Sequence, residues 1–297
     1  MSRPTTGAEV IEFTDPGCSW AWGSEPKFRL LRWRYGELLG WRRVLGGLVG
    51  DMSAQVEDFD PVRAAKRYVP YWREVYEHTR MSYPVNLKWM YRSTEPACRA
   101  VKAAEMQSDE IGARVLRRLR EQIFIFGEPA DTDELILDAV AGVQGLDPER
   151  FSVDLDTDLV EKTFREDWAE TRRPSQYVLS LEGDRPGIGR AKHTEGHWRY
   201  VFPTVLFRSA DREETVPGWC DYEDYELALE DVAPGATDER RTDPTPEEYF
   251  ATWPTATQRE LEILCGPDPK PPSDIVRYDW GDGTFYLTQT EAAVRGI

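Results

Sequence analysis

The first fifty residues carry two apolar patterns in quick succession. Val10, Ile11 and Phe13 form a β-branched and aromatic run closed by Asp15-Pro16-Gly17, which predicts a buried strand ending in a turn. From Ser19 onward apolar residues recur at spacings of three and four, which predicts a helix with an apolar face of Phe28, Leu31, Tyr35 and Leu38. A second strand is predicted over 41–49, giving a right-handed βαβ unit with a partly parallel sheet.

From about residue 52 to residue 197 the apolar spacing becomes helical. Helices are predicted over 61–78, 94–106 and 111–126, with shorter ones beginning near 131 and 146. Thr94 is the expected N-cap of the second of these helices. The arginines of 111–126 are expected to form a solvated cationic face. A stretch of this length is too long for a loop, so it is predicted to be an inserted helical domain.

The pattern returns to strands after the insertion. The run Trp198–Phe207 reads as an apolar strand interrupted by Pro203, which removes a ladder hydrogen bond. A second strand near 214–218 and a helix over 222–230 follow. The simplest interpretation of Pro203 is an edge-strand proline with an ordinary trans bond.

Beyond residue 232 a linker rich in Pro, Asp and Thr leads to a helix over 258–264 and a hairpin over 275–288, with Asp282-Gly283 at its turn. A helix followed by a hairpin suggests a winged-helix fragment, but no basic cluster supports DNA binding, so a small packed appendage is expected. The predicted organisation is an α/β domain in two parts (1–52 and 199–232), an inserted helical domain (53–198), and a linker with a C-terminal helix-hairpin extension (233–297).

The net charge of the chain limits the classes of molecule that it can bind. The net charge of -17 argues against nucleic acid and anionic membranes, since phosphates would be repelled. Of the 37 basic residues 30 are Arg, a Lys-poor balance typical either of salt adaptation or of an ordinary acidic cytosolic protein. The N-terminus shows no secretory signal and no apolar run is long enough for a membrane span, so a cytoplasmic protein is expected.

Cysteine is the main candidate for chemistry. The four cysteines (Cys18, Cys98, Cys220 and Cys265) form no Cys-x-x-Cys motif, so neither a disulfide framework nor a zinc knuckle is indicated. Cys18 lies at the predicted strand-to-helix junction, where free amides and the helix dipole favour a thiolate. We therefore expect Cys18 to be partly exposed, with a depressed pKa; the alternative is a small buried apolar cysteine.

Two histidines are candidate ligands for a metal site. His193 and His197 are four residues apart with Glu195 between them, and on a helix they would share one face. Gly189 and Gly196 argue against a helix there, and the stretch 172–196 reads as a polar loop. No metal and no bound cofactor are predicted.

The segment around Cys18 resembles the active-site segment of the DsbA-like branch of the thioredoxin superfamily, which typically reads Asp-Pro-x-Cys-x-Trp-Cys-Trp/Tyr. Asp15, Pro16, Cys18, Trp20 and Trp22 are present, but Ala21 stands where that pattern has its second, resolving cysteine. A helix followed by Gly-Leu-Asp-Pro-Glu-Arg-Phe (145–151) is similar to the helical insertion of FrnE-type proteins. The resemblance covers about residues 8–230.

This resemblance implies a thioredoxin-like α/β fold with a large inserted helical domain and a small C-terminal extension. In that fold a cis-proline followed by Thr commonly faces the active-site cysteine, so the Phe202-Pro203 bond is expected to be cis, with Pro203 within contact distance of Cys18. The substrate groove is expected to be lined by aromatic side chains and by the cis-proline backbone, from Trp20, Trp22, Phe202, Pro203 and Thr204.

The leading functional hypothesis is a thiol-disulfide oxidoreductase with Cys18 as its single catalytic nucleophile. Cys18 would attack a disulfide of a protein or a small molecule, and an external thiol, with a low-molecular-weight thiol as candidate co-substrate, would resolve the mixed disulfide. One alternative is an enzyme similar to the kappa-type glutathione transferases and isomerases, in which Cys18 or Ser19 activates a bound thiol. The other is a redox-inactive, protein-binding adaptor of the same fold.

Overall fold

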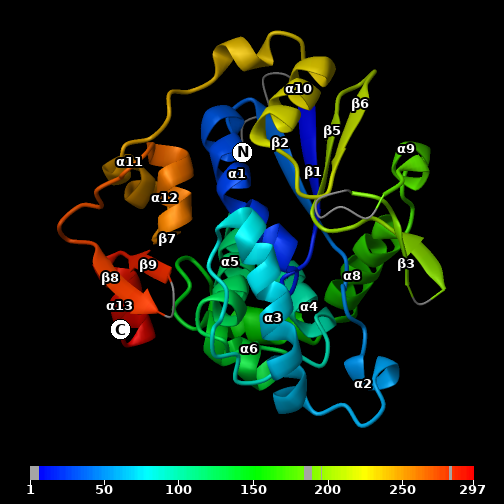
Figure 1. The fold of residues 1–297 in the computed structure, drawn as a ribbon, viewed down its shortest axis with the longest axis vertical. Coiled ribbons are helices and arrows are strands. Elements are labelled where there is room, and N and C mark those ends of the chain that lie inside the picture. The colour runs from blue at the N-terminus through cyan, green and yellow to red at the C-terminus, as the bar shows by residue number, and fades with distance from the viewer. Residues whose placement is uncertain (1–6, 184–188, 195, 281–282) are drawn as a thin grey trace.

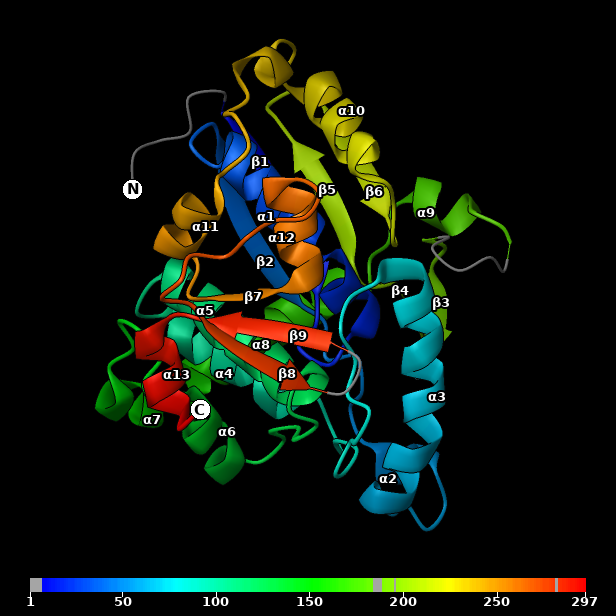
Figure 2. The same ribbon diagram turned by 60° about the vertical axis from the view of Figure 1, so that its left-hand side comes forward.

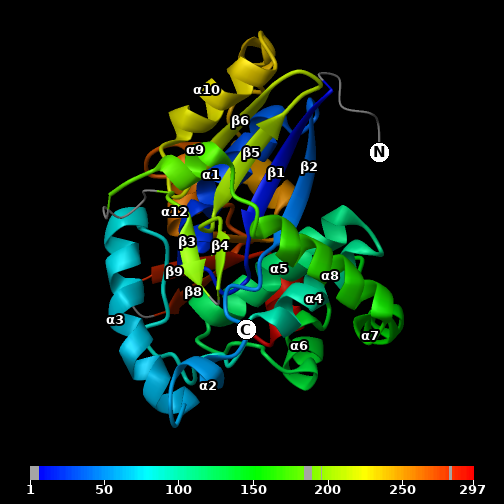
Figure 3. The ribbon, with the colours of Figure 1, turned by 90° about the vertical axis from the view of Figure 1, so that its right-hand side faces the viewer.

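The computed structural model describes residues 7–183, 189–194, 196–280 and 283–297. In this part of the chain the main sheet has the order β2-β1-β5-β6 (Figures 1 and 3), from β1 (Ala8–Thr14), β2 (Leu39–Leu45), β5 (Thr204–Arg208) and β6 (Glu213–Pro217). β1 and β2 are parallel, joined through α1 (Ser19–Tyr35), whereas β1 pairs antiparallel with β5 and β5 with β6. The predicted thioredoxin-like α/β fold is confirmed.

The two faces of this sheet have separate cores because side chains alternate along each strand. Val10 and Phe207 pack with α1 and with α10 (Tyr222–Val232) on one face. Ile11, Phe13 and Leu206 pack on the other face, against residues that include Cys18 and Phe202. The cysteine therefore belongs to the core on the second face.

The helical insertion consists of α2 (Met52–Gln55), α3 (Pro61–Thr79), α4 (Glu95–Glu105), α5 (Asp109–Phe124), α6 (Asp133–Val140), α7 (Pro148–Leu155), α8 (Asp158–Thr171) and α9 (Gln176–Ser180). Side-chain caps begin several of these helices, from Asp60, Ser108, Thr132, Asp147 and Thr157. The expected solvated face of α5 is wrong: Arg117, Arg118 and Arg120 are buried, each with a carboxylate partner.

The segment before β5 differs from its prediction. The stretch expected to be a polar loop contains α9 and the strand β3 (Lys192–Thr194), which pairs antiparallel with β4 (His197–Arg199). The expected strand Trp198–Phe207 is broken into β4 and β5, because the Pro203 nitrogen has no hydrogen to donate. Among the described residues, no group of three or more His, Cys, Asp and Glu could hold a metal ion. None of the described helices is both long and apolar enough to cross a membrane.

The C-terminal extension begins with η1 (Ala236–Glu239) and α11 (Pro246–Thr252). A sheet of order β7-β9-β8 follows (Figure 2), from β7 (Thr255–Thr257), β8 (Val276–Trp280) and β9 (Gly283–Leu287), with α12 (Gln258–Cys265) and α13 (Gln289–Arg295). The predicted helix and hairpin are confirmed as α12 and β8-β9, whereas the turn residue Asp282 lies outside the described residues. Leu261 and Leu264 of α12 pack on Leu30 of α1, so the extension is docked on the main domain.

Candidate functional site

Cys18 is the N-cap of α1, directly after the turn that ends β1. Its backbone is extended (φ -84°, ψ 111°), and its carbonyl accepts a hydrogen bond of 3.0 Å from the Trp22 amide. Gly17 precedes it because there is no room for a side chain: a Cβ at Gly17 would lie 2.6 Å from Cγ2 of Thr94. The strand-to-helix position predicted for Cys18 is confirmed.

Asp15 fixes the turn from inside the protein. Its fully buried carboxylate accepts hydrogen bonds from the Gly17 and Leu48 amides at 2.8 and 2.6 Å, from the Thr94 hydroxyl at 3.1 Å and from the Cys98 thiol at 3.4 Å. Burial raises the pKa of Asp15 against the opposing effect of these donors. Thr94 is the N-cap residue of α4, but its hydroxyl serves Asp15 and makes no cap hydrogen bond.

The Phe202-Pro203 bond is cis, and it lies against Cys18. The Cys18 thiol donates to the Phe202 carbonyl at 3.1 Å across 184 residues of sequence. The Phe202 ring packs over Gly46, where a Cβ would come within 1.9 Å of it, and the Pro203 carbonyl accepts from the Gly218 amide at 2.9 Å. The predicted cis bond is confirmed, and the contact that joins it to the cysteine is made by the Phe202 carbonyl.

The state of the Cys18 thiol differs from its prediction. Only 5% of the residue is exposed, and burial raises the pKa of the thiol. The amides of Ala21 and Trp20 act in the opposite direction, and the nearby Asp15 charge adds to the increase. The expectation of a partly exposed thiol with a depressed pKa is therefore wrong, because desolvation outweighs the helix terminus.

Most of the other residues expected to line a groove lie in the core. Trp22 is only 2% exposed, its indole N–H donates to the Ser82 carbonyl at 2.7 Å, and its ring stacks on Phe124. Phe202, Pro203 and Thr204 are also buried, and the Thr204 hydroxyl donates to the Val201 carbonyl at 2.8 Å. The placement of Trp22 along a groove is corrected, because its indole packs into the space between α1 and the insertion.

Trp20 is the candidate that reaches the surface, and three residues absent from the sequence prediction join it. Its indole N–H donates to the Tyr71 hydroxyl at 3.0 Å, and its ring lies 5.8 Å from the His78 ring and 6.2 Å from the Trp219 ring. We call these four residues the aromatic patch. Tyr71 and His78 are seven residues apart, two turns along α3, a spacing that could have placed them on one face.

Two solved structures of similar fold are described by names that refer to disulfide chemistry. A putative protein disulfide isomerase from Nitrosomonas europaea aligns with a TM-score of 0.57 and 17% identity, over 75% of this chain and 96% of its own. A probable DsbA oxidoreductase from Streptomyces coelicolor aligns with a TM-score of 0.52 and 18% identity, over 90% of this chain and all of its own. At these identities the likeness concerns the fold.

Similarity of sequence leads to a differently named group. The ClpXP adapter protein SpxH of Shouchella clausii is 27% identical over 259 residues, which is 86% of this chain and 77% of that protein. SpxH of Halalkalibacterium halodurans is 29% identical over 208 residues, or 67% of this chain and 66% of that protein.

A family-level match covers the part of the chain that contains the site. The family model described as thioredoxin matches residues 12–173, more than half of the chain, from within β1 through the helical insertion. Together with the cysteine at the start of α1, the cis-proline beside it and the DsbA-like fold neighbours, this match assigns the chain to the DsbA-like thioredoxin family.

Proposed function

We propose that the chain is a protein-binding adaptor that uses the thioredoxin-like fold without its redox chemistry, and that it presents a partner protein to ClpXP. The observation that carries the proposal is the closed state of Cys18, which is buried and donates its hydrogen to the Phe202 carbonyl. We place this activity in the cytoplasm, the location expected from the sequence.

Disulfide exchange needs three things of a cysteine: access to the partner sulfur, thiolate character, and a second thiol that releases the product. Cys18 is 5% exposed, and burial raises its pKa. Ala21 replaces the resolving thiol and is itself fully buried. All three differ from what a dithiol enzyme requires, whereas protein binding requires none of them.

The similar sequences support the same conclusion. The two SpxH proteins are described as ClpXP adapters, and their similarity extends across most of this chain. In the Shouchella clausii protein the aligned length exceeds that of the thioredoxin match, so the likeness includes residues beyond the family segment.

A second candidate keeps the chemistry of the fold. The Cys18 thiol lies next to the cis-proline at the start of a helix, and the Trp20 and Ala21 amides oppose the effect of burial on its pKa. A movement that opened this site would allow a single-thiol exchange with a disulfide, followed by release with a low-molecular-weight thiol.

A reconstitution with purified ClpXP separates the two candidates. The tagged chain and its Cys18→Ala variant would each be used to recover partner proteins from an extract of the cells that produce this protein. Cys265→Ala is the matched cysteine control. Each recovered partner would then be incubated with ClpXP and ATP, with and without the chain. We expect at least one partner to be degraded at least fivefold faster with the chain, equally for all three forms within a factor of two.

A different outcome would favour single-thiol exchange. If recovery depends on Cys18, if the complexes are released by dithiothreitol, and if no partner is degraded faster, the adaptor proposal fails and single-thiol exchange takes its place.

A further inference from the structure

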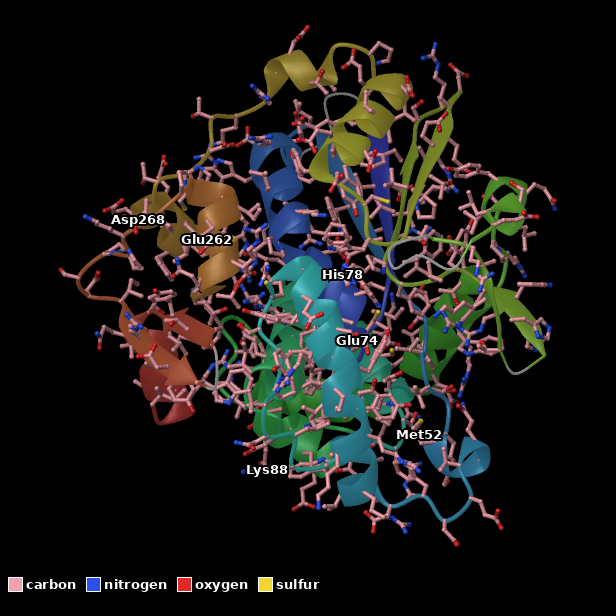
Figure 4. The ribbon with its side chains drawn as sticks, viewed as in Figure 1. Met52, Glu74, His78, Lys88, Glu262 and Asp268 are labelled. Carbon is pink, nitrogen blue, oxygen red and sulfur yellow. The ribbon has the colours of Figure 1, made fainter. Side chains whose placement is uncertain are left out.

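The aromatic patch is built from three separate parts of the chain around the buried cysteine. Trp20 comes from the first turn of α1, Tyr71 and His78 come from α3, and Trp219 follows β6. Tyr71 and His78 are exposed and both tryptophans are partly exposed. Figure 4 labels His78 at the end of α3 that lies beside the start of α1. The patch is therefore an accessible surface directly next to Cys18.

Internal contacts hold this surface in shape. The Trp20 indole donates to the Tyr71 hydroxyl at 3.0 Å, and the His78 and Trp219 rings lie 6.5 Å apart. The Lys27 ammonium lies 4.1 Å from the centre of the Trp219 ring. Rigid aromatic side chains lose little conformational entropy on binding, which is why they dominate the energetic centres of protein interfaces.

The charges beside the patch are mostly negative. Glu74 and Glu77 are exposed on the same helix as Tyr71 and His78, and Figure 4 labels Glu74 next to His78. On the other side, Asp221, Glu223 and Asp224 are exposed at the start of α10. The carboxylates reach the rings electrostatically, because Glu74 acts on the Tyr71 hydroxyl and Asp221 and Asp224 act on Lys27.

The cations near the patch are already engaged. Lys27 lies over Trp219, Arg73 donates to the Tyr83 hydroxyl at 3.0 Å, and the Arg80 guanidinium lies 5.8 Å from the Tyr76 ring centre. An incoming cation would therefore meet exposed carboxylates and the negative faces of the rings together. Both features attract Arg and Lys side chains, and the carboxylates repel an acidic segment.

We propose that the aromatic patch is the docking surface for a positively charged segment of the partner protein, with Arg or Lys side chains against the indoles of Trp20 and Trp219 and ion pairs to Glu74 and Asp224. The inference rests on the proposed adaptor function and assigns the chemistry of the partner segment. Lys27 over Trp219 is an internal example of the same contact.

The probe for this proposal is a phage-displayed library of random twelve-residue peptides, selected against the full chain. We expect the selected peptides to be net positive and rich in Arg or Lys. For synthetic, fluorescein-labelled versions followed by anisotropy, Trp20→Ala and Tyr71→Ala are expected to weaken binding at least tenfold and Glu74→Lys at least threefold. Binding is also expected to weaken with rising salt, since exposed charges are screened.

Two controls match these changes. Leu227→Ala removes an apolar side chain that is 66% exposed on α10, and Glu134→Lys makes the same charge reversal at an exposed position of α6. Both are expected to leave peptide binding unchanged within a factor of two. Because Glu74→Lys alters an exposed side chain, it tests the proposal even if Trp20→Ala impairs folding.

Every other result overturns the proposal: a library that yields no peptide, selected peptides that are neutral or acidic, or binding that Glu74→Lys does not change. The ClpXP experiment separates this failure from failure of the adaptor function. If Trp20→Ala and Glu74→Lys still support full degradation of the partner, the docking surface is wrong and the adaptor function stands. If the peptides bind as expected but no partner is degraded, the docking surface stands and the adaptor function is wrong.

Discussion

Two buried regions of this protein contrast in the chemistry they contain. Cys18 shares an apolar core cluster with Ile11, Ala21 and Phe202, and both burial and the nearby Asp15 charge favour its neutral thiol. At the junction between α5 and the C-terminal extension, charged side chains are buried in pairs: Arg117 with Glu260 and Arg118 with Glu291. The residue expected to be a thiolate is a neutral thiol, and the helix face expected to be solvated contains buried ion pairs.

The junction is a connected network. Arg117 donates to both carboxylate oxygens of Glu260 at 2.7 and 2.9 Å, and the Glu260 side chain is fully buried. Glu121 accepts from the Thr255 hydroxyl at 2.6 Å and pairs with Arg295, which also pairs with Glu291 at 2.7 Å. Each of these three carboxylates therefore takes part in contacts that join α5 to the extension.

The buried ion pairs bear on how the extension is positioned against the rest of the chain. Buried ion pairs cost desolvation and are weak evidence of extra stability, but a partner missing from such a pair is expensive, so the pairs favour one arrangement of the two parts. The extension lies outside the segment of the family match, which ends at residue 173. The protein thus has a buried thiol at the start of α1 and an extension that buried ion pairs hold in a defined position.

The largest expected effect comes from breaking the junction at Glu260. Glu260→Gln removes one of the two carboxylates beside each of two buried guanidinium groups: Arg117 keeps Glu121 at 2.5 Å, and Arg29 keeps Glu25 at 3.6 Å. We expect the free energy of unfolding in urea to fall by about 3 kcal/mol, the lower end of the usual loss on removing one partner of a buried pair, because each arginine keeps a second carboxylate. The matched control is Glu262→Gln on the same helix, whose carboxylate is 38% exposed and paired with Arg259. An exposed pair contributes about 1 kcal/mol or less, so equal losses for the two variants would contradict the network's role.

The second effect is a loss of stability in acid. Buried Glu121 and Glu25 have pKa values of about 2, because neighbouring arginines (Arg295 and Arg117 at Glu121, Arg120 and Arg29 at Glu25) outweigh the opposing effect of burial. A carboxylate whose pKa is lower in the folded state stabilises the fold above its unfolded pKa, and that contribution is lost as the pH falls toward its folded pKa. We expect the unfolding free energy, measured in urea, to fall steeply between about pH 4.5 and pH 2.

Protonation of Asp167 has the opposite effect on the free energy of unfolding, and this provides an internal check. Its pKa is raised to about 6, mainly by burial, against the effect of Lys102. Protonating it between about pH 6 and pH 4 stabilises the folded state, because the unfolded chain takes up this proton only at lower pH. The acid loss should therefore begin only below about pH 4.5, and Asp167→Asn should remove the preceding gain. A steady decline from pH 7 in both proteins would be incompatible with these assignments.

The contrast also explains which parts of the structure the sequence could predict. The βαβ unit, α3 and α12 follow from apolar spacing and local turn and capping residues. The cis bond before Pro203 follows from the resemblance to the DsbA-like branch and not from the apolar pattern. The exposure of Cys18 could not be predicted in this way, because it depends on a core cluster that includes Phe202, which is 184 residues away in sequence. The network at α5 depends in the same way on Glu260 and Glu291.

One error could have been avoided from helix geometry alone. Trp20 and Trp22 are two residues apart on α1, and side chains at that spacing point in different directions, so both could not line one groove. The structure places Trp20 in the aromatic patch and Trp22 in the core. The role of Trp20 in binding stays a prediction.

Ala21→Cys has the smallest expected effect on stability. It adds a second thiol beside Cys18 and so changes the chemistry of that region directly. Cys18 is the N-cap and Ala21 the third residue of α1, so the two Cα atoms lie across one turn at a separation that a disulfide can bridge. The variant should form an internal disulfide on oxidation with diamide, seen as the loss of two hydrogens in the mass of the intact protein. The closed loop is so short that the gain in unfolding free energy should not exceed about 2 kcal/mol.

The activity of that variant tests whether the absence of a second thiol is enough to prevent dithiol exchange at this site. If it reduces insulin while the parent does not, the loss of one cysteine separates this chain from a dithiol enzyme. If it forms the disulfide but does not exchange with any substrate, the cover over Cys18 also prevents catalysis, because exchange requires the attacking sulfur to reach its target. The buried thiol and its bond to the Phe202 carbonyl favour the second result. The matched control, Ala21→Ser, places a group of similar size at the same buried position without a thiol, so any activity it shares with Ala21→Cys would come from loosened packing.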